Sequence, residues 1–220
     1  MKERINIAAF KKPLEGSDIK GNRDFLMQLK EDRRFIIREI HQPIAEAATL
    51  RGLYDDLRDF GISAPMRFII AEKNEESLKY HESIEDTEGR KTIYAITDKI
   101  TPADLNDKTA QEQFGKDIVD LYSKIIDYYL AKLESGKAYL TDIGGWDQFV
   151  YGKREGDEQN HMYLVDAGGE HSYRPNSLLM LLETRLLSEI NNVDRQYDGS
   201  SGRLSKRADA LWKKTRSKIV

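Results

Sequence analysis

A chain of 220 residues is long enough for one domain with a substantial core, or for two small lobes. Hydrophobic residues make up 39% and charged residues 33%, which indicates a globular protein with a heavily charged surface and excludes a disordered chain or a fibre. The formal charge of -3 provides no overall attraction to nucleic acid or anionic membrane. The absence of cysteine excludes disulfides and thiolate chemistry, and no run is apolar enough for a signal peptide or a membrane span, so we expect a cytoplasmic protein.

Five short apolar runs predict five strands in the first hundred residues. Polar or Gly-containing segments bound these runs, which cover residues 5–10, 24–30, 34–40, 66–73 and 91–100. The polar turn between the second and third runs predicts an antiparallel hairpin that ends near Ile40. The charged stretch between the last two runs is expected to be a solvated loop.

Between the third and fourth runs the apolar spacing becomes that of a helix. Pro43 suits a first-turn position, and Leu50, Leu53 and Leu57 recur at helical intervals until Gly61. The pattern predicts a helix over 43–60 with one apolar face.

The second half of the chain begins with a long predicted helix. Thr101 and Pro102 supply a capping residue and a first-turn proline, and from about Gln111 to Gly136 the chain is amphipathic. The side chains expected to point inward are Phe114, Ile118, Leu121, Ile125 and Leu133.

A loop and a hairpin are expected next, over residues 139–170. The letters TDIGGWD form a Gly-containing loop, and the β runs QFVYGKR and HMYLVDAG are separated by the turn-rich EGDEQN. The run SLLMLLETRLLSEI and the basic segment 203–220 then predict further helices. The order is therefore three strands, a helix, two strands, a long helix, a loop, a β-hairpin and further helices.

Three aspartates of the segment 139–170 carry a resemblance to a known family. Asp142-Ile-Gly-Gly-Trp-Asp147 resembles the D-x-x-x-x-N catalytic loop of kinases, and Leu-Val-Asp166-Ala-Gly168 resembles their D-F-G metal-binding turn. With the order of elements, these motifs make the chain resemble the protein-kinase-like fold, in particular minimal relatives such as RIO-like and small-molecule kinases. The resemblance implies an α+β, two-lobed fold. A five-stranded antiparallel N-lobe with one helix would cover 1–100, and a short, mainly helical C-lobe with a catalytic β-hairpin would cover 101–220.

The resemblance also implies a chemistry for the aspartates. Phosphoryl transfer needs mainly positioning and charge neutralisation, and Mg²⁺ prefers carboxylate oxygens. The family's activity would make ATP and Mg²⁺ the cofactors and a protein or small-molecule hydroxyl the acceptor. Asp142 would be the catalytic base, and Asp147 and Asp166 would bind metal. Aspartate at 147 replaces the family's asparagine, which adds a negative charge and predicts unusual metal dependence or nucleotide affinity.

Arg38 and Glu46 are the nucleotide-binding residues that the resemblance implies in the N-lobe. The kinase V-A-I-K pattern would fall on Phe35-Ile-Ile-Arg38, where arginine keeps the charge of the lysine but not its shape. Glu46 shares the apolar face of the predicted helix 43–60, so we expect its carboxylate to point inward and to pair with Arg38. The alternatives are an exposed strand charge for Arg38 and a first-turn carboxylate that favours the helix dipole for Glu46.

Two departures from the family pattern support a second interpretation. Arginine stands in place of the phosphate-contacting lysine, and no G-x-G-x-x-G loop is present. The chain would then be a pseudokinase or a regulatory adaptor that binds nucleotide or a partner without transfer.

The end of the chain is strongly basic. From 203 to 220 there are seven Lys or Arg against one Asp, interleaved with apolar residues at near-helical spacing. This pattern is explained by a solvated face that closes the second lobe, or by a contact with an acidic partner or nucleic acid. In the second case the chain would be a helical, nucleic-acid-associated protein, which leaves the aspartates without a role.

Overall fold

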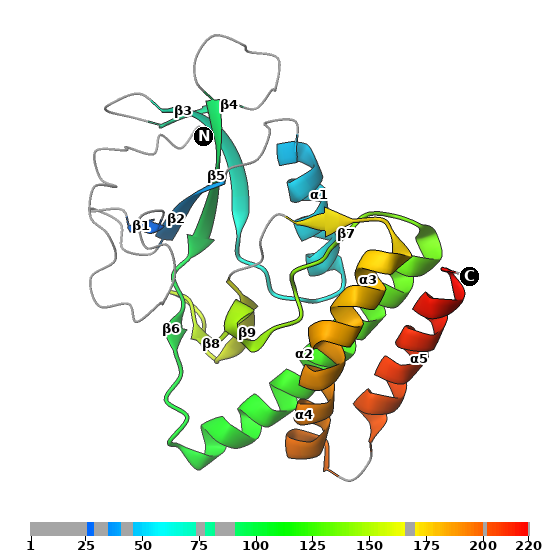
Figure 1. Ribbon diagram of the computed structural model, residues 1–220. Helices are drawn as coiled ribbons and strands as arrows, with labels where there is room; N and C mark the ends of the chain where they lie inside the picture. The colour runs from blue at the N-terminus through cyan, green and yellow to red at the C-terminus, as the bar shows by residue number, and fades with distance from the viewer. Residues whose placement is uncertain are drawn as a thin grey trace. The chain divides into compact units, whose positions relative to one another are not determined.

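A computed structural model describes residues 26–28, 35–40, 46–73, 78–81, 91–165, 170–199 and 202–219. The chain divides into two compact units, Met1–Tyr54 with Pro65–Lys99 and Asp55–Ala64 with Ile100–Val220. Helices and small antiparallel sheets are both present, so the protein belongs to the α+β class (Figure 1). The strand predicted at 5–10 lies outside the described residues.

The first unit contains a five-stranded antiparallel sheet with the strand order β1-β2-β5-β3-β4. The strands are β1 (Leu26–Gln28), β2 (Phe35–Ile40), β3 (Arg67–Lys73), β4 (Leu78–His81) and β5 (Lys91–Asp98). β2 pairs with β5 along its whole length, and the predicted hairpin of β1 and β2 is confirmed. The prediction of a loop after β3 was wrong in part, because Leu78 and Tyr80 alternate with polar residues and let β4 pair with β3.

Helix α1 (Glu46–Asp59) confirms the helix predicted over 43–60. Its apolar spacing buries the expected leucines, namely Leu50, Leu53 and Leu57. Within the first unit, Tyr54 packs edge-on against Phe68 with 4.8 Å between ring centroids. Helix α1 crosses the boundary between the units, since its residues from Asp55 onward belong to the second.

The second unit is mainly helical. It contains α2 (Lys108–Ser135), α3 (Pro175–Leu181), a π-helical turn η4 (Leu182–Leu186), α4 (Leu187–Tyr197) and α5 (Arg203–Ser217). Helix α5 packs against α2, α3 and α4 (Figure 1). The five inward side chains predicted for α2 are all buried, and they join a core that includes Leu178, Leu182, Leu186, Ile190, Leu204 and Leu211.

The start of α2 differs from the prediction. Asp107 is the N-cap, because its side chain accepts a hydrogen bond from the N–H of Thr109 at 3.1 Å. Thr101–Pro102 instead form a short strand, β6, which pairs with Lys153 and Gly152. A proline is tolerated there because β6 is an edge strand. The predicted end at Gly136 is confirmed by its left-handed backbone, with φ of 65°.

The predicted hairpin is confirmed as β8 (Phe149–Lys153) and β9 (His161–Leu164). Before it lie β7 (Tyr139–Leu140), which pairs with β10 (His171–Ser172), and a 3₁₀ turn, η3 (Trp146–Gln148). Residues 141–148, between β7 and β8, carry two of the predicted aspartates and are called the aspartate loop below.

Candidate functional site

Three tyrosines of α2 hold the backbone of β7 and the aspartate loop. The hydroxyl oxygen of Tyr128 accepts a hydrogen bond from the N–H of Leu140 at 3.0 Å, and the Tyr129 hydroxyl donates to the C=O of Leu140 at 3.0 Å. The Tyr122 hydroxyl donates to the C=O of Gly144 at 3.4 Å. Because all three side chains are buried on one helix, α2 determines the path of the backbone into the loop.

Burial further favours the neutral form of these tyrosines. It raises the pKa values of Tyr128 and Tyr129 well above the ordinary value for tyrosine. The pKa of Tyr122 is raised by burial and by the carboxylate of Glu189, while the guanidinium of Arg185 opposes the shift. The hydroxyls therefore serve as hydrogen-bonding groups at neutral pH and not as bases.

Gln148 closes the aspartate loop from its far end. Its side-chain oxygen accepts a hydrogen bond from the N–H of Gly145 at 3.0 Å, and its side-chain nitrogen donates to Oδ1 of Asp142. The N–H of Val165, just after β9, donates to the Gln148 carbonyl at 2.9 Å. Because Gln148 is buried, it holds the Asp142 carboxylate in one orientation and ties the loop to the hairpin.

The guanidinium group of Arg185 forms ion pairs with both aspartates of the loop. Its Nη2 donates to Oδ1 of Asp147, and its Nη1 lies 3.9 Å from Oδ1 of Asp142. Arg185 lies on the π-helical turn η4, an irregularity that occurs frequently at functional sites. The aspartate loop is therefore bound to the helical layer through one guanidinium group.

Two of the five predicted site residues are thus brought together. Asp142 is half-buried and Asp147 is exposed, and both lie in the second unit. Asp166 lies outside the described residues.

The two predicted nucleotide-binding residues belong to the first unit. Arg38 lies in β2 opposite Leu26 and Ala95, and its side chain is not among those described. Glu46 is half-buried in the first turn of α1. Their pairing stays a prediction.

Gln148 and Arg185 were not predicted as site residues from the sequence. A signal for Arg185 was present, since it is the single basic residue in the apolar run SLLMLLETRLLSEI. A charge among leucines needs a partner. Nothing in the sequence indicated that the partner lay in the aspartate loop.

The donor chemistry of the loop suits a hard cation. Asp142 and Asp147 present carboxylate oxygens, the ligand type that Mg²⁺ prefers, and both lie close enough to interact with one positive group. In the part of the chain that is described, no group of three or more His, Cys, Asp or Glu is arranged to hold a metal ion. Further ligands would have to come from Asp166, from nucleotide phosphates or from water.

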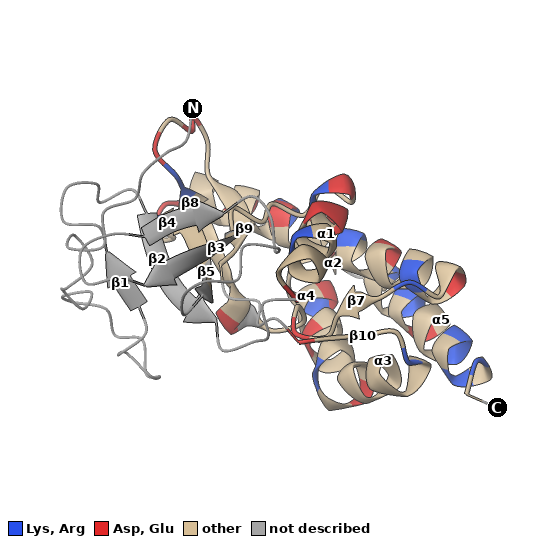
Figure 2. Ribbon diagram, turned by 90° about the horizontal axis from the view of Figure 1, so that it is seen from above, with Lys and Arg blue, Asp and Glu red and all other residues tan. Residues whose placement is uncertain are grey.

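The basic helix α5 has acidic neighbours within the second unit (Figure 2). Arg207 contacts Asp127 and Ser123 of α2, and Lys214 contacts Glu134. Its apolar side buries Leu204, Ala208 and Leu211. These contacts favour the interpretation of α5 as a packed helix with a solvated face, and an external acidic partner stays a prediction.

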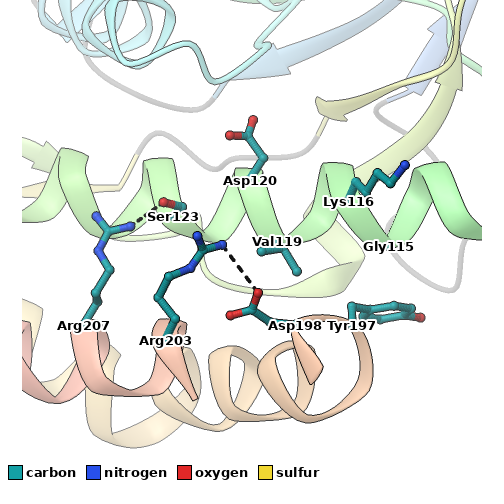
Figure 3. A pocket seen from close by; sticks show the side chains of 9 residues that line it. All are labelled: Gly115, Lys116, Val119, Asp120, Ser123, Tyr197, Asp198, Arg203 and Arg207. Carbon is teal, nitrogen blue, oxygen red and sulfur yellow. Dashed lines mark hydrogen bonds and ion pairs between the residues drawn. The ribbon is translucent and has the colours of Figure 1, made fainter. Parts of the chain in front are cut away.

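A pocket of about 420 Å³ lies between α2, the end of α4 and α5 (Figure 3). Its charged lining residues are Lys116, Arg203, Arg207, Asp120 and Asp198. Arg203 lies 3.4 Å from Asp198, and Arg207 contacts Ser123. One cation of the lining, Arg203, is thus already paired with a carboxylate of the lining, Asp198.

Comparison with models of known protein families gives no match, and a comparison with curated proteins gives none either. Over the described residues, the helices are all too short or too polar to span a lipid bilayer. Inferences about function therefore depend on the site itself.

Proposed function

We propose that the protein is an ATP- and Mg²⁺-dependent phosphotransferase of the protein-kinase-like fold, with its reaction centre at the aspartate loop. The observation that carries this proposal is the joint orientation of Asp142 and Asp147 by Gln148 and Arg185. Two carboxylates held in one short loop before a β-hairpin have the layout that the kinase resemblance requires. The acceptor is a hydroxyl group of a protein or a small molecule.

Each residue has a distinct role in this proposal. Asp142, oriented by Gln148, would accept the proton of the acceptor hydroxyl or orient it for attack. Asp147 and Asp166 would hold Mg²⁺, which when bound neutralises charge on the phosphates. Arg38 would contact the phosphates, and Glu46 would be the ion-pair partner that orients Arg38.

A pseudokinase or regulatory adaptor is the second candidate, and a specific contact favours it. Arg185 already partly neutralises Asp142 and Asp147, which weakens the demand of these carboxylates for a metal ion. Such a protein would bind nucleotide or a partner without transferring phosphate.

A thermal-shift titration with ATP and Mg²⁺ tests the proposal. A ligand at 100 times its Kd stabilises the folded state by about 2.7 kcal/mol, and this stabilisation raises the Tm measurably. We expect this rise in the wild type, its loss in Asp166→Ala, and its retention in Asp209→Ala, an exposed position on α5. No rise at millimolar ATP would contradict the proposal.

A second variant separates the two candidates. Asp142→Asn keeps the shape of the side chain but removes the base, so we expect nucleotide binding to persist and release of the γ-phosphate to an acceptor or to water to stop. The measurement is ³²P transfer from γ-labelled ATP. Wild-type protein that binds ATP but shows no transfer would identify a pseudokinase.

A further inference from the structure

One guanidinium group, that of Arg185, forms ion pairs with both carboxylates of the aspartate loop. The Nη2 atom of Arg185 donates to Oδ1 of Asp147, and Nη1 is 3.9 Å from Oδ1 of Asp142. The Arg185 side chain is 36% exposed and that of Asp147 is 74% exposed, so water reaches the pair. The contact is therefore one that a dissolved cation could compete with.

The loop backbone is shaped to admit this guanidinium. A Cβ atom at Gly145 would lie 1.6 Å from Nη2 and 2.0 Å from Cζ of Arg185, so any other residue there would displace the group. Gly145 is not among the described glycines with a left-handed backbone, so a positive φ is not the reason for glycine at this position. Glycine at 145 thus provides space for Arg185.

The position of Arg185 is also fixed from its own side. It lies on η4 between Leu182 and Leu186, both of which are fully buried. Because these leucines anchor the turn in the core, the guanidinium is held at the loop by packing as well as by charge.

We infer that Arg185 is a built-in counter-cation for Asp147 and Asp142, and that it determines how strongly the loop takes up a divalent cation. For a metal ion to be bound by Oδ1 of Asp147, it must displace Nη2 of Arg185, and a nearby guanidinium repels it. Arg185 is thus a positioning residue that keeps both carboxylates oriented while lowering metal affinity. The inference rests on the proposed function in treating the loop as a metal-binding element.

The test is a Mn²⁺ titration without nucleotide, with free Mn²⁺ followed by electron paramagnetic resonance. Mn²⁺ is a suitable probe because it accepts the same oxygen ligands as Mg²⁺. We expect Arg185→Gln to tighten Mn²⁺ binding about tenfold over the wild type, since it removes a unit charge beside the ligands. Adding Asp147→Asn to Arg185→Gln should weaken binding again, because a ligand is lost.

Two glycine variants provide an independent test. Gly145→Ala displaces the guanidinium without touching its charge and should also tighten Mn²⁺ binding. Gly144→Ala is the matched control, because a Cβ there would meet Leu186 at an ordinary 3.4 Å, and its affinity should equal that of the wild type. Circular dichroism establishes that each variant is folded.

The outcomes separate this inference from the proposed function. Equal Mn²⁺ affinity in the wild type, Arg185→Gln and Gly145→Ala, or no Mn²⁺ binding by any of them, overturns the role of Arg185. If both variants bind Mn²⁺ more tightly while ATP stabilises none of the proteins, the role of Arg185 stands and the phosphotransferase proposal fails.

Discussion

The ammonium group of Lys132, buried on α2, donates to the carboxylate of Asp56 in the last turns of α1. The Lys132 side chain is 5% exposed and that of Asp56 is 38% exposed. The ammonium also lies 5.6 Å from the centroid of the Tyr128 ring. A buried cation is thus stabilised by one carboxylate and one aromatic ring within the second unit.

We predict that removing the carboxylate is more damaging than removing the cation. Asp56→Ala leaves the Lys132 ammonium without its carboxylate and should lower the free energy of unfolding by about 2 kcal/mol. Lys132→Met keeps the apolar stem and should cost less. Urea denaturation measures both.

The control for Asp56 is its neighbour Asp55. The Asp55 side chain is 67% exposed and pairs with Arg58 at the surface, so Asp55→Ala should change stability by less than about 0.5 kcal/mol. A larger loss in Lys132→Met than in Asp56→Ala would contradict the prediction.

The second prediction concerns the tyrosines that hold Leu140. Tyr128→Phe and Tyr129→Phe each remove one buried hydrogen bond to Leu140 and should lower stability at pH 7 by about 1–2 kcal/mol. Tyr173, which is 65% exposed, supplies the control, and Tyr173→Phe should be neutral.

The raised pKa values of these tyrosines also predict that the folded protein loses stability at alkaline pH. Burial raises the pKa of Tyr128 in the folded state, so the unfolded state loses its proton first as pH rises. The contribution of Tyr128 to the free energy of unfolding is therefore fully present below about pH 10, the pKa of tyrosine in the unfolded state. It falls as the pH rises above that value. The Phe variants, which lack a titrating hydroxyl, should show a shallower fall between pH 9 and pH 11 by the same denaturation assay.

The third prediction concerns Asp194 of α4, which caps the start of α5. Its carboxylate accepts hydrogen bonds from the N–H of Leu204 at 3.3 Å, from the N–H of Ser205 at 3.2 Å and from the Ser205 hydroxyl. Burial acts to raise its pKa, but the hydrogen bonds from Ser205 and Leu204 outweigh burial and hold the pKa below the ordinary value. The N-cap residue itself is Gly202, which has no side chain to do this.

Asp194→Ala should therefore lower stability by about 2 kcal/mol at pH 7. Because the pKa is depressed in the folded state, this contribution is present above about pH 4 and is lost as pH falls through the folded-state pKa. Urea denaturation at pH 7 and at pH 3 should show the difference between variant and wild type shrinking with acid. A difference that stays constant would mean that Asp194 acts through packing alone.

The fourth prediction concerns the basic face of α5. Arg207 and Lys214 contact Asp127 and Glu134 of α2, so neutralising these carboxylates removes the charge partners of two cations. Asp127→Asn with Glu134→Gln should elute from a heparin column at higher salt than the wild type.

The control for this pair has the same net charge. Asp104→Asn with Glu112→Gln neutralises two exposed acidic residues outside the Asp127 and Glu134 pairs, and it should elute earlier than the first pair. Equal elution of the two double variants would show that heparin binding depends only on net charge. It would contradict the prediction that the basic face of α5 binds a polyanion when its carboxylate partners are removed.

Much of the local structure could be read from the sequence. The spacing of Leu50, Leu53 and Leu57 predicted α1, and the glycine at 136 predicted the end of α2, because helix periodicity and a left-handed cap are local properties. The start of α2 was misplaced, since Thr101-Pro102 fits a helix start and an edge strand equally well. Strand β4 was not predicted, because the charged residues around it indicated a loop.

The candidate site was predicted only in part. The sequence by itself determined that Asp142 and Asp147 share one short loop before a hairpin, because their separation is only five positions along the chain. Only the tertiary structure decided that the guanidinium of Arg185 pairs with both carboxylates. Periodicity indicates that Arg185 lies in an apolar helical run, but the residue it meets depends on how η4 packs beside the loop. Such a contact is set by the packing of distant segments, which no local pattern encodes.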